Sequence, residues 1–334
     1  MLTRVEIENF KAIEKLTMDF TSRLTVIVGP NGSGKTSILE AIYAAGHKTP
    51  TTENRRRTAI NGPIVRLYTA TGCQVAWTAD APAPTRRILF DDDAAEPIEH
   101  VPSSVLLHFD PQKMGQPTFD DSSLPPLNTD GSNIASVLVS RRLSQPRLFD
   151  AIEQQVRNVI PQVRQIRFER VPLTVSGKDS KGATREVVGE RIHFDMLQAS
   201  DVPADQVSEG TLFALGIVTA CVLNEGPILL LIDDIDASLH PAAQADLVRV
   251  IRHVQTERIG LQLVTTSHSP YLLNALEFDE IRITTLNDDG RVVCGRLSDH
   301  PNFERWKDEM TPGEMWGMWG ESWLTKKPEE VLQP

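Results

Sequence analysis

One glycine-rich stretch near the start of the sequence constrains this chain more than any other. A β-branched run at 25–28 predicts a buried strand, and apolar residues at helical spacing over 37–42 predict a helix. Between them, residues 29–36 spell GPNGSGKT, which fits the pattern G-x-x-x-x-G-K-[ST] in the strand-to-helix context that the pattern requires. We therefore predict a phosphate-binding loop, with a glycine-rich turn that holds no ligand as the alternative.

The chemistry expected of this loop follows from its backbone and two of its side chains. Glycines let backbone N–H groups close around an anion, and the start of the helix adds partial positive charge. Lys35 can reach the β- and γ-phosphates of a nucleotide, and the Thr36 hydroxyl can bind Mg²⁺. The residues predicted to form the nucleotide site here are Asn31, Gly32, Ser33, Gly34, Lys35, Thr36 and Ser37.

Composition argues against several other classes of protein. The 334 residues are 40% hydrophobic and 24% charged, which indicates a soluble globular protein of one large or two small domains. No apolar run approaches the ~20 residues of a membrane span, so we expect no membrane partner. A net charge of −11 does not favour a broad nucleic-acid surface, although a local basic patch is compatible with it. Cys73, Cys221 and Cys294 are expected to be core thiols, which favours a reducing, cytoplasmic compartment.

Hydrophobic patterning predicts an α/β chain in four parts. Residues 1–110 begin with a hairpin that leads into the loop strand, and the short strands that follow indicate an antiparallel side sheet. Residues 111–205 combine two helical segments with two long strands. Residues 206–300 alternate helices and buried strands, which predicts a parallel sheet flanked by helices. The predicted strands are 3–8, 16–20, 64–70, 74–78, 86–90, 105–109, 163–175, 186–197, 228–232, 261–265, 280–286 and 291–297, and the predicted helices are 133–140, 146–160, 211–223, 241–255 and 269–276.

The fourth part, residues 301–334, is a tail that is unusually rich in tryptophan. It holds four of the five tryptophans of the chain, Trp306, Trp316, Trp319 and Trp323. One interpretation is that these rings pack back on the sheet. The other is a docking surface for a partner, because Trp and Met are enriched at interfaces.

Two adjacent acids follow the apolar strand at 228–232. Ligands of open α/β sheets bind at the carboxyl ends of strands, so Asp233 is placed to hold Mg²⁺. Asp234 would then act as the general base, or would polarise the attacking water. The alternative is that both are ordinary turn residues after a strand.

Two further motifs fit the same site. His268 ends the next strand, where a histidine can donate a hydrogen bond to a γ-phosphate, although lone histidines after strands are often surface residues. Ser208 and Gly210 precede the apolar helix at 211–223. They favour a helix start in any case, and together with the helix dipole they could form a second phosphate site.

In this order, the motifs resemble those of ABC-type ATPase heads of the SMC and RecF kind. The sequence is most similar to compact, AAA-labelled ATP-binding proteins of bacterial defence operons, which also resemble the ATPase half of OLD nucleases. The resemblance is strong over 1–45 and 205–285 and implies a P-loop NTPase fold of ABC/SMC-head type. In that fold a mixed sheet is flanked by helices, with an antiparallel side sheet and a helical insert. The motifs that carry the resemblance lie at 8–13, 29–36, 208–211, 233–234, 238–241 and 266–270.

The resemblance also implies a mechanism and partners. ATP and Mg²⁺ would be the cofactors, with Lys35, Thr36 and Asp233 acting in one head. Ser208 and Gly210 would reach the γ-phosphate held by a second copy, in a head-to-tail homodimer or a higher even oligomer. Closure of this dimer would gate a separate effector, expected to be a nuclease of an antiviral defence system. The chain continues for only about 65 residues after His268, fewer than the ~100 typical of another domain, so we expect no fused nuclease.

One contact and one departure from the family pattern leave questions open. Gln112 is a candidate Mg²⁺ contact, although Gln116 lies nearby. The family usually has glutamate where this chain has Asp234, which shortens the reach by about an ångström, and a misplacement of that size can cost ~10²-fold in rate. Hydrolysis by the expected catalytic set of Asp234, His268 and Lys35 would then be slow. The alternatives are a RecF-like DNA-repair ATPase that clamps DNA and a nucleotide-dependent scaffold with little turnover.

Overall fold

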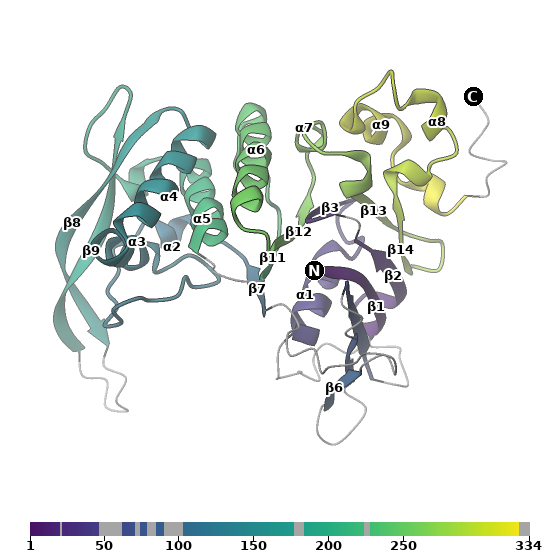
Figure 1. The fold of residues 1–334 in the computed structure, drawn as a ribbon, viewed down its shortest axis with the longest axis horizontal. Helices are drawn as coiled ribbons and strands as arrows, with labels where there is room; N and C mark the ends of the chain where they lie inside the picture. Colours follow the sequence, from purple (N-terminus) through teal and green to yellow (C-terminus); the bar gives the residue numbers. More distant parts are fainter. Residues whose placement is uncertain are drawn as a thin grey trace. The chain divides into compact units, whose positions relative to one another are not determined.

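The computed structural model describes residues 1–20, 22–46, 62–70, 74–78, 85–89, 103–176, 184–223 and 228–326 (Figure 1). Cys73 lies outside these residues, whereas Cys221 is buried and Cys294 is partly buried. The chain divides into two compact units. The first consists of Met1–Leu106, Glu225–Asp236 and Gln255–Pro334, and the second of Leu107–Asn224 and Ala237–Val254. The division into four parts stays a prediction.

The first unit is built on a six-stranded sheet in the order β14-β13-β3-β12-β11-β7. Strands β3 (Leu24–Val28), β11 (Ile228–Ile232) and β12 (Leu261–Ser267) are buried along their whole length. They run parallel to one another, as do β3 and β13 (Ile281–Leu286), while β14 (Val292–Arg296) returns antiparallel to β13. The edge strand next to β11 is β7 (Ser103–Leu107). The predicted mixed sheet is thereby confirmed.

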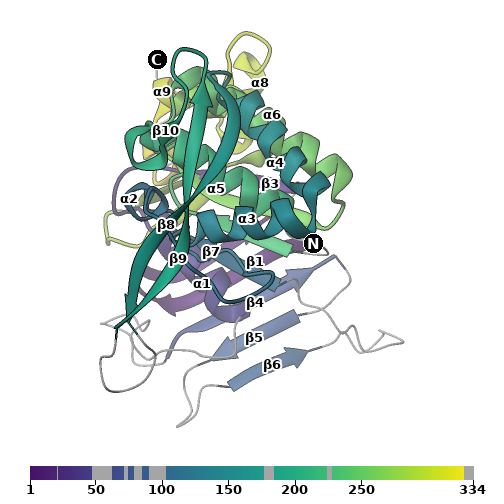
Figure 2. The ribbon, with the colours of Figure 1, turned by 90° about the vertical axis from the view of Figure 1, so that its left-hand side faces the viewer.

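A second, antiparallel sheet of the first unit follows the order β2-β1-β4-β5-β6, which confirms the predicted side sheet (Figure 2). Its strands are β1 (Leu2–Phe10), β2 (Ile13–Asp19), β4 (Ile64–Thr69), β5 (Gln74–Thr78) and β6 (Thr85–Leu89). Helix α1 (Lys35–Gly46) buries Ile38, Leu39 and Ile42 in one hydrophobic cluster with residues of β1 and β2. This cluster holds the helix that follows the phosphate-binding loop.

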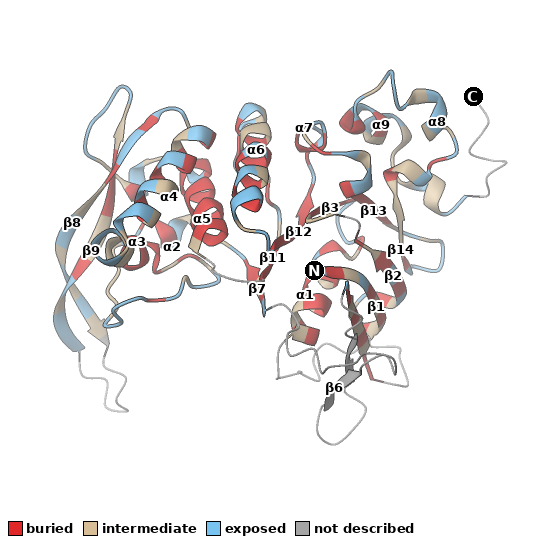
Figure 3. Cartoon of the chain, in the orientation of Figure 1, coloured by how far each residue is buried: buried red, intermediate tan, exposed pale blue. Residues whose placement is uncertain are grey.

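The second unit combines helices with a long β-hairpin. Helix α4 (Pro146–Val159) is amphipathic and buries Phe149, Ile152 and Val156. Helix α5 (Glu209–Leu223) is apolar on every side, and its residues from Gly210 to Val222 are all buried (Figure 3). The other elements are α2 (Pro111–Met114), α3 (Ile134–Ser144), β8 (Val163–Ser176), β9 (Thr184–Met196) and β10 (Val202–Pro203). Helix α6 (Pro241–Glu257) begins in this unit and ends in the first.

The C-terminal residues pack back on the first unit in short helices. These are α7 (Pro270–Leu273), α8 (Phe303–Trp306) and α9 (Pro312–Trp319), followed by a 3-10 turn at Ser322–Leu324. The Trp319 ring stacks on His300 with ring centroids 3.8 Å apart. Residues 301–326 are therefore folded, with their tryptophans partly buried, and both interpretations of the tail stay predictions. Within the described ranges, no helix has the length and hydropathy that crossing a membrane would require.

Candidate nucleotide site

The phosphate-binding loop connects β3 to α1, and its glycines fix its shape. Gly32 and Gly34 have φ angles of 79° and 91°, a left-handed region that favours glycine. A Cβ atom on Gly29 would lie 2.1 Å from the Thr284 carbonyl oxygen, so no side chain fits there. The Ser33 Oγ lies 2.9 Å from the Thr284 Oγ1, and this pair joins the loop to β13. Asn31 and Gly32 are exposed at the tip of the loop, and Ser37 is partly buried in the first turn of α1.

Lys35 lies inside the curve of this loop. The side chain is only 7% exposed, and its Nζ donates hydrogen bonds to the carbonyl oxygens of Gly29 at 2.9 Å and Pro30 at 3.0 Å. Burial lowers the pKa of Lys35, while the charges of Asp234 and Asp233 act to raise it. A cation enclosed by the loop suits the binding of phosphate oxygens.

Thr36 and Asp233 meet across the ends of two elements. The Thr36 Oγ1 donates a hydrogen bond to the Asp233 Oδ2 at 2.9 Å, and the Thr266 Oγ1 donates to the other carboxylate oxygen at 2.5 Å. Mg²⁺ prefers oxygen ligands and is often held by one or two protein groups together with waters and substrate phosphates. A hydroxyl and a carboxylate at this separation fit such an ion. No group of three or more His, Cys, Asp or Glu that could hold a metal occurs in the described part of the chain.

Asp234 and His268 lie beside this pair. The Asp234 backbone has a φ of 50°, and its N–H donates to the Thr266 Oγ1 at 2.7 Å. The His268 Nε2 is 3.9 Å from the Asp234 Oδ1. Burial raises the pKa of Asp234 and the neighbouring charge of Asp233 adds to this effect, while His268 opposes it. The arrangement places a carboxylate with increased proton affinity next to a histidine.

Thr266 is a site residue that begins the motif at 266–270 but was not predicted to have a role in the site. Its hydroxyl contacts the Asp233 carboxylate and the Asp234 backbone, so it orients both acids. The available signal was its place in that motif, two residues before His268. The structure therefore gathers Lys35, Thr36, Asp233, Asp234 and His268 at the carboxyl ends of β3, β11 and β12.

The remaining predicted residues belong to the second unit. Ser208 is exposed and caps α5, since its Oγ accepts a hydrogen bond from the Thr211 N–H at 3.2 Å. Gly210 is buried against residue 238, and a Cβ on it would lie 2.4 Å from the Ser238 carbonyl oxygen. Ser208 and Gly210 line a cavity of about 510 Å³ together with Ser238. Gln112 is exposed on α2, and its predicted contact with Mg²⁺ stays a prediction.

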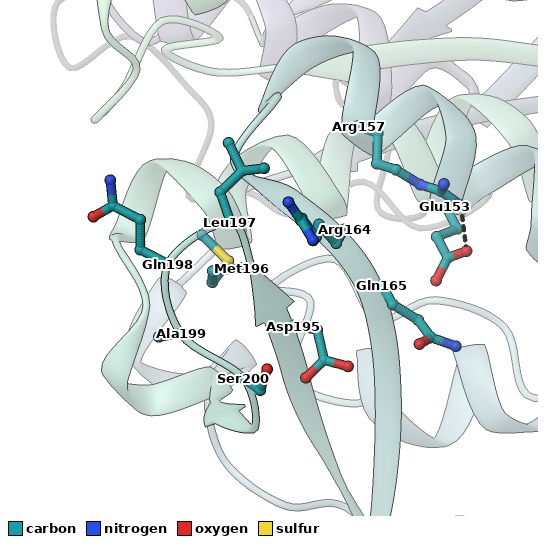
Figure 4. A pocket seen from close by; sticks show the side chains of 10 residues that line it. All are labelled: Glu153, Arg157, Arg164, Gln165, Asp195, Met196, Leu197, Gln198, Ala199 and Ser200. Carbon is teal, nitrogen blue, oxygen red and sulfur yellow. Dashed lines mark hydrogen bonds and ion pairs between the residues drawn. The ribbon is translucent and has the colours of Figure 1, made fainter.

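A larger cavity of about 630 Å³ in the second unit is not lined by any predicted site residue (Figure 4). Arg157 is paired with Glu153 at 2.5 Å, and Asp195 accepts from Arg167 at 2.8 Å. Most of the charges that line this cavity are therefore already balanced by protein groups, which gives it no clear preference for an anion or a cation.

Fold and site together define a P-loop nucleotide-binding protein of the ABC/SMC-head class. The chain belongs to the family of AAA domains. The family model described as "AAA domain, putative AbiEii toxin, Type IV TA system" matches residues 107–274, and a second model, described as "AAA domain", matches residues 4–188. Each match spans about half of the chain.

Individual relatives support the same class. The chain is 21% identical to the Septu protein PtuA of Bacillus thuringiensis, over 95% of the chain and 84% of PtuA. It is 23% identical to the OLD nuclease of Thermus scotoductus, over 90% of the chain but only 65% of that nuclease. The DNA replication and repair protein RecF of Psychromonas ingrahamii is 53% identical over 45 residues, which is 14% of the chain and 12% of RecF.

Solved structures confirm the fold. An SMC head bound to the C-terminal winged-helix domain of ScpA superposes with a TM-score of 0.58 at 15% identity, covering 89% of the chain and 98% of that head. An SMC head of Pyrococcus furiosus with an extended coiled coil gives 0.56 at 14% identity, covering 92% and 99%. The predicted resemblance to SMC, RecF and OLD-like, AAA-labelled proteins of defence operons is confirmed.

Proposed function

We propose that this protein binds ATP with Mg²⁺ in the loop at 29–36, hydrolyses it slowly, and uses ATP-dependent pairing of two copies to gate a separate effector. The observation that carries the proposal is the contact between the Thr36 hydroxyl and the Asp233 carboxylate, next to the enclosed ammonium of Lys35. This combination of loop, hydroxyl, acid and lysine is suited to bind a nucleoside triphosphate.

Each residue of the site would have a separate role in hydrolysis. Thr36 and Asp233 would hold Mg²⁺, which supplies positive charge to the phosphates when it is bound. Lys35 would bind the β- and γ-phosphate oxygens. Asp234 would accept a proton from the attacking water, whose oxygen bonds to the γ-phosphorus as the bond to ADP breaks. The raised pKa of Asp234 favours its role as a proton acceptor.

Pairing would complete the site. Ser208, which is exposed and caps the start of α5, would face a γ-phosphate held by a second copy. The similarity to the OLD nuclease and to the Septu protein PtuA supports an ATPase of a defence system, and we propose that its effector is a separate, nuclease-like protein.

Lys35→Ala tests the nucleotide site directly. We expect ATP binding, measured by isothermal titration with Mg²⁺, to fall at least 100-fold, because the enclosed cation is lost. Lys113→Ala is the matched control, since Lys113 lies on α2 in the second unit, where it pairs with Asp130 at 2.9 Å. Equal ATP affinity in Lys35→Ala and the native protein would overturn the site assignment.

A scaffold that binds ATP with little turnover is the second candidate. It is favoured by Asp234, whose side chain is one methylene shorter than the family's usual glutamate. Phosphate release by the native protein and by Asp234→Asn separates the two. Release that falls at least tenfold in the variant supports an ATPase, while equal and negligible release supports the scaffold.

A further inference from the structure

Thr284 lies on β13 at the point where the phosphate-binding loop leaves the sheet. Strand β13 lies between β3 and β14, and its parallel pairing with β3 ends at Ile283, opposite Val28 (Figure 1). The next residue of β13 is Thr284, which is fully buried. Its Oγ1 donates a hydrogen bond to the Val28 carbonyl oxygen at 3.1 Å. A side-chain hydroxyl therefore continues the contact between the two strands at the residue before the loop.

The same hydroxyl determines which way the Ser33 hydroxyl bonds. Thr284 has a single O–H, and it is donated to the Val28 carbonyl oxygen, which can only accept. In the 2.9 Å contact between the Ser33 Oγ and the Thr284 Oγ1, Ser33 is therefore the donor. Ser33 is only 1% exposed. Ionised phosphate oxygens accept hydrogen bonds, so a Ser33 hydroxyl that donates to Thr284 has no second proton for a phosphate.

The hairpin of β13 and β14 also encloses two glycines of the loop. A Cβ on Gly29 would lie 2.1 Å from the carbonyl oxygen of Thr284 and 2.8 Å from its Oγ1. A Cβ on Gly34 would lie 2.7 Å from the Val292 Cγ2. Val292 pairs with Leu286, two residues after Thr284, so Thr284 and Val292 point to the same side of the hairpin. Both ends of the loop therefore pack against one face of one hairpin.

A buried arginine fixes the start of β13. Arg282 is 2% exposed, and its guanidinium donates hydrogen bonds to the carbonyl oxygens of Asp19 at 2.6 Å and Asp279 at 2.7 Å. These bonds join β13 to the end of β2 and to the 3-10 turn at Phe278–Glu280 that precedes it. The strand that carries Thr284 is therefore held at its start and paired on both sides.

We propose that Thr284 is a positioning residue for the nucleotide, which holds the loop at 29–34 in its phosphate-binding shape through Val28 and Ser33. The Ser33 hydroxyl then supports the loop from behind and makes no contact with phosphate. The proposal rests on the proposed ATP site and adds a residue that sets its affinity. A loop that is already ordered loses less conformational entropy when a ligand binds, so pre-organisation raises affinity.

Thr284→Val tests the proposal, because valine is close to threonine in size and lacks the hydroxyl. We expect the affinity for a non-hydrolysable ATP analogue with a β,γ-imido bridge, measured by calorimetry with Mg²⁺, to fall about tenfold. Thr284→Ser keeps the hydroxyl and is expected to bind like the native protein. Thr265→Val is the matched control, since it removes a buried hydroxyl of β12 that donates to the Ile232 carbonyl oxygen. Equal affinities in Thr284→Val and Thr265→Val would overturn the proposal.

A double-mutant cycle distinguishes this role from a direct contact between Ser33 and phosphate. Because the two hydroxyls act through one bond, Ser33→Ala is expected to lose about as much affinity as Thr284→Val, and the double variant no more than either. Losses that multiply in the double variant would show that each hydroxyl acts independently, and would contradict the proposal.

Hydrogen exchange of the nucleotide-free proteins measures the order of the loop without any ligand. The amides of residues 31–34 are expected to exchange about tenfold faster in Thr284→Val than in the native protein, while those of β11 keep their rates. Unchanged exchange in the loop would refute the role of Thr284 and leave the ATP site standing. Absence of analogue binding by the native protein would refute the proposed function itself.

Discussion

At the scale of single residues, the site depends on a threonine that binds no phosphate in our proposal. Thr266 connects Asp233 and Asp234 through one hydroxyl, at 2.5 Å to a carboxylate oxygen of the first and 2.7 Å to the backbone nitrogen of the second. A carboxylate that is to hold a metal ion must be oriented before the ion arrives. The hydroxyl of Thr266 provides this orientation.

Thr266→Val should therefore impair catalysis more than stability alone explains. Loss of the hydroxyl is expected to cost about 1–3 kcal/mol in free energy of unfolding and to lower phosphate release at least tenfold. Thr265→Val is the control, because the Thr265 Oγ1 donates to the Ile232 carbonyl oxygen at 2.6 Å and contacts neither acid. Urea unfolding and phosphate release are measured for both. Similar rates in the two variants would contradict the role of Thr266.

Asp234 gives a pH-dependent expectation. Its folded-state pKa is raised above the ordinary 3.8, so the protonated carboxyl group stabilises the folded state relative to the ionised one. This stability is present at low pH and is lost as the pH rises through the raised pKa. Asparagine does not ionise, so Asp234→Asn avoids the loss of stability at higher pH, and asparagine also tolerates the φ of 50°. The melting temperature of the variant should exceed that of the native protein at pH 7, and the difference should shrink below pH 4. A difference that stays constant with pH would argue against this account.

At the scale of elements, α5 shows how a glycine can fix a motif. Gly210 packs so closely against the Ser238 carbonyl oxygen that Gly210→Ala requires a shift of the backbone at 238. We expect a loss of about 1–3 kcal/mol in free energy of unfolding, measured in urea. Gly317→Ala in α9 is the matched change with nothing within 4 Å of the new Cβ, and should stabilise by up to about 1 kcal/mol. Opposite signs for the two substitutions are the expected result, and equal signs would contradict it.

Elements with strong local patterns could be predicted from the sequence, and elements defined by distant contacts could not. The apolar runs that became β11 and α5 were predicted within a few residues, because burial on all sides leaves a continuous apolar signal. Helix α3 runs to Ser144, beyond the predicted residue 140, because its last turn is polar and lacks periodicity. The two-residue strand β10 was missed, since it exists only through pairing with β9.

The candidate site divides in the same way. Five of the site residues lie within local motifs, and the types and order of these motifs predict a shared site. They are Lys35, Thr36, Asp233, Asp234 and His268. Thr266 begins the motif at 266–270, but its role does not follow from that motif. The role arises from a hydroxyl that contacts the acids at the end of a neighbouring strand, and such a contact leaves no local pattern.

At the scale of the whole molecule, the proposed function needs two copies, and Ser208 allows a test that preserves the fold. Ser208→Asp keeps a good helix cap and adds a negative charge where the triphosphate of a partner would lie. In an Asp234→Asn background with ATP, light scattering should show a dimer, and Ser208→Asp should shift it to monomer. Ser208→Asn, a cap without charge, should leave the dimer intact. Dimers of all three proteins would argue against a phosphate contact at Ser208.

The sheet that carries the phosphate-binding loop also has a consequence for synthesis on the ribosome. Strand β3 ends at Val28, but its two neighbours begin at Leu261 and Ile281. The loop is therefore synthesised early, and β3 has no neighbouring strand on either side until the last quarter of the chain has been synthesised. A product that terminates after the GPNGSGKT motif but before Leu261 lacks both neighbouring strands and His268, so it carries the motif without the rest of the proposed site.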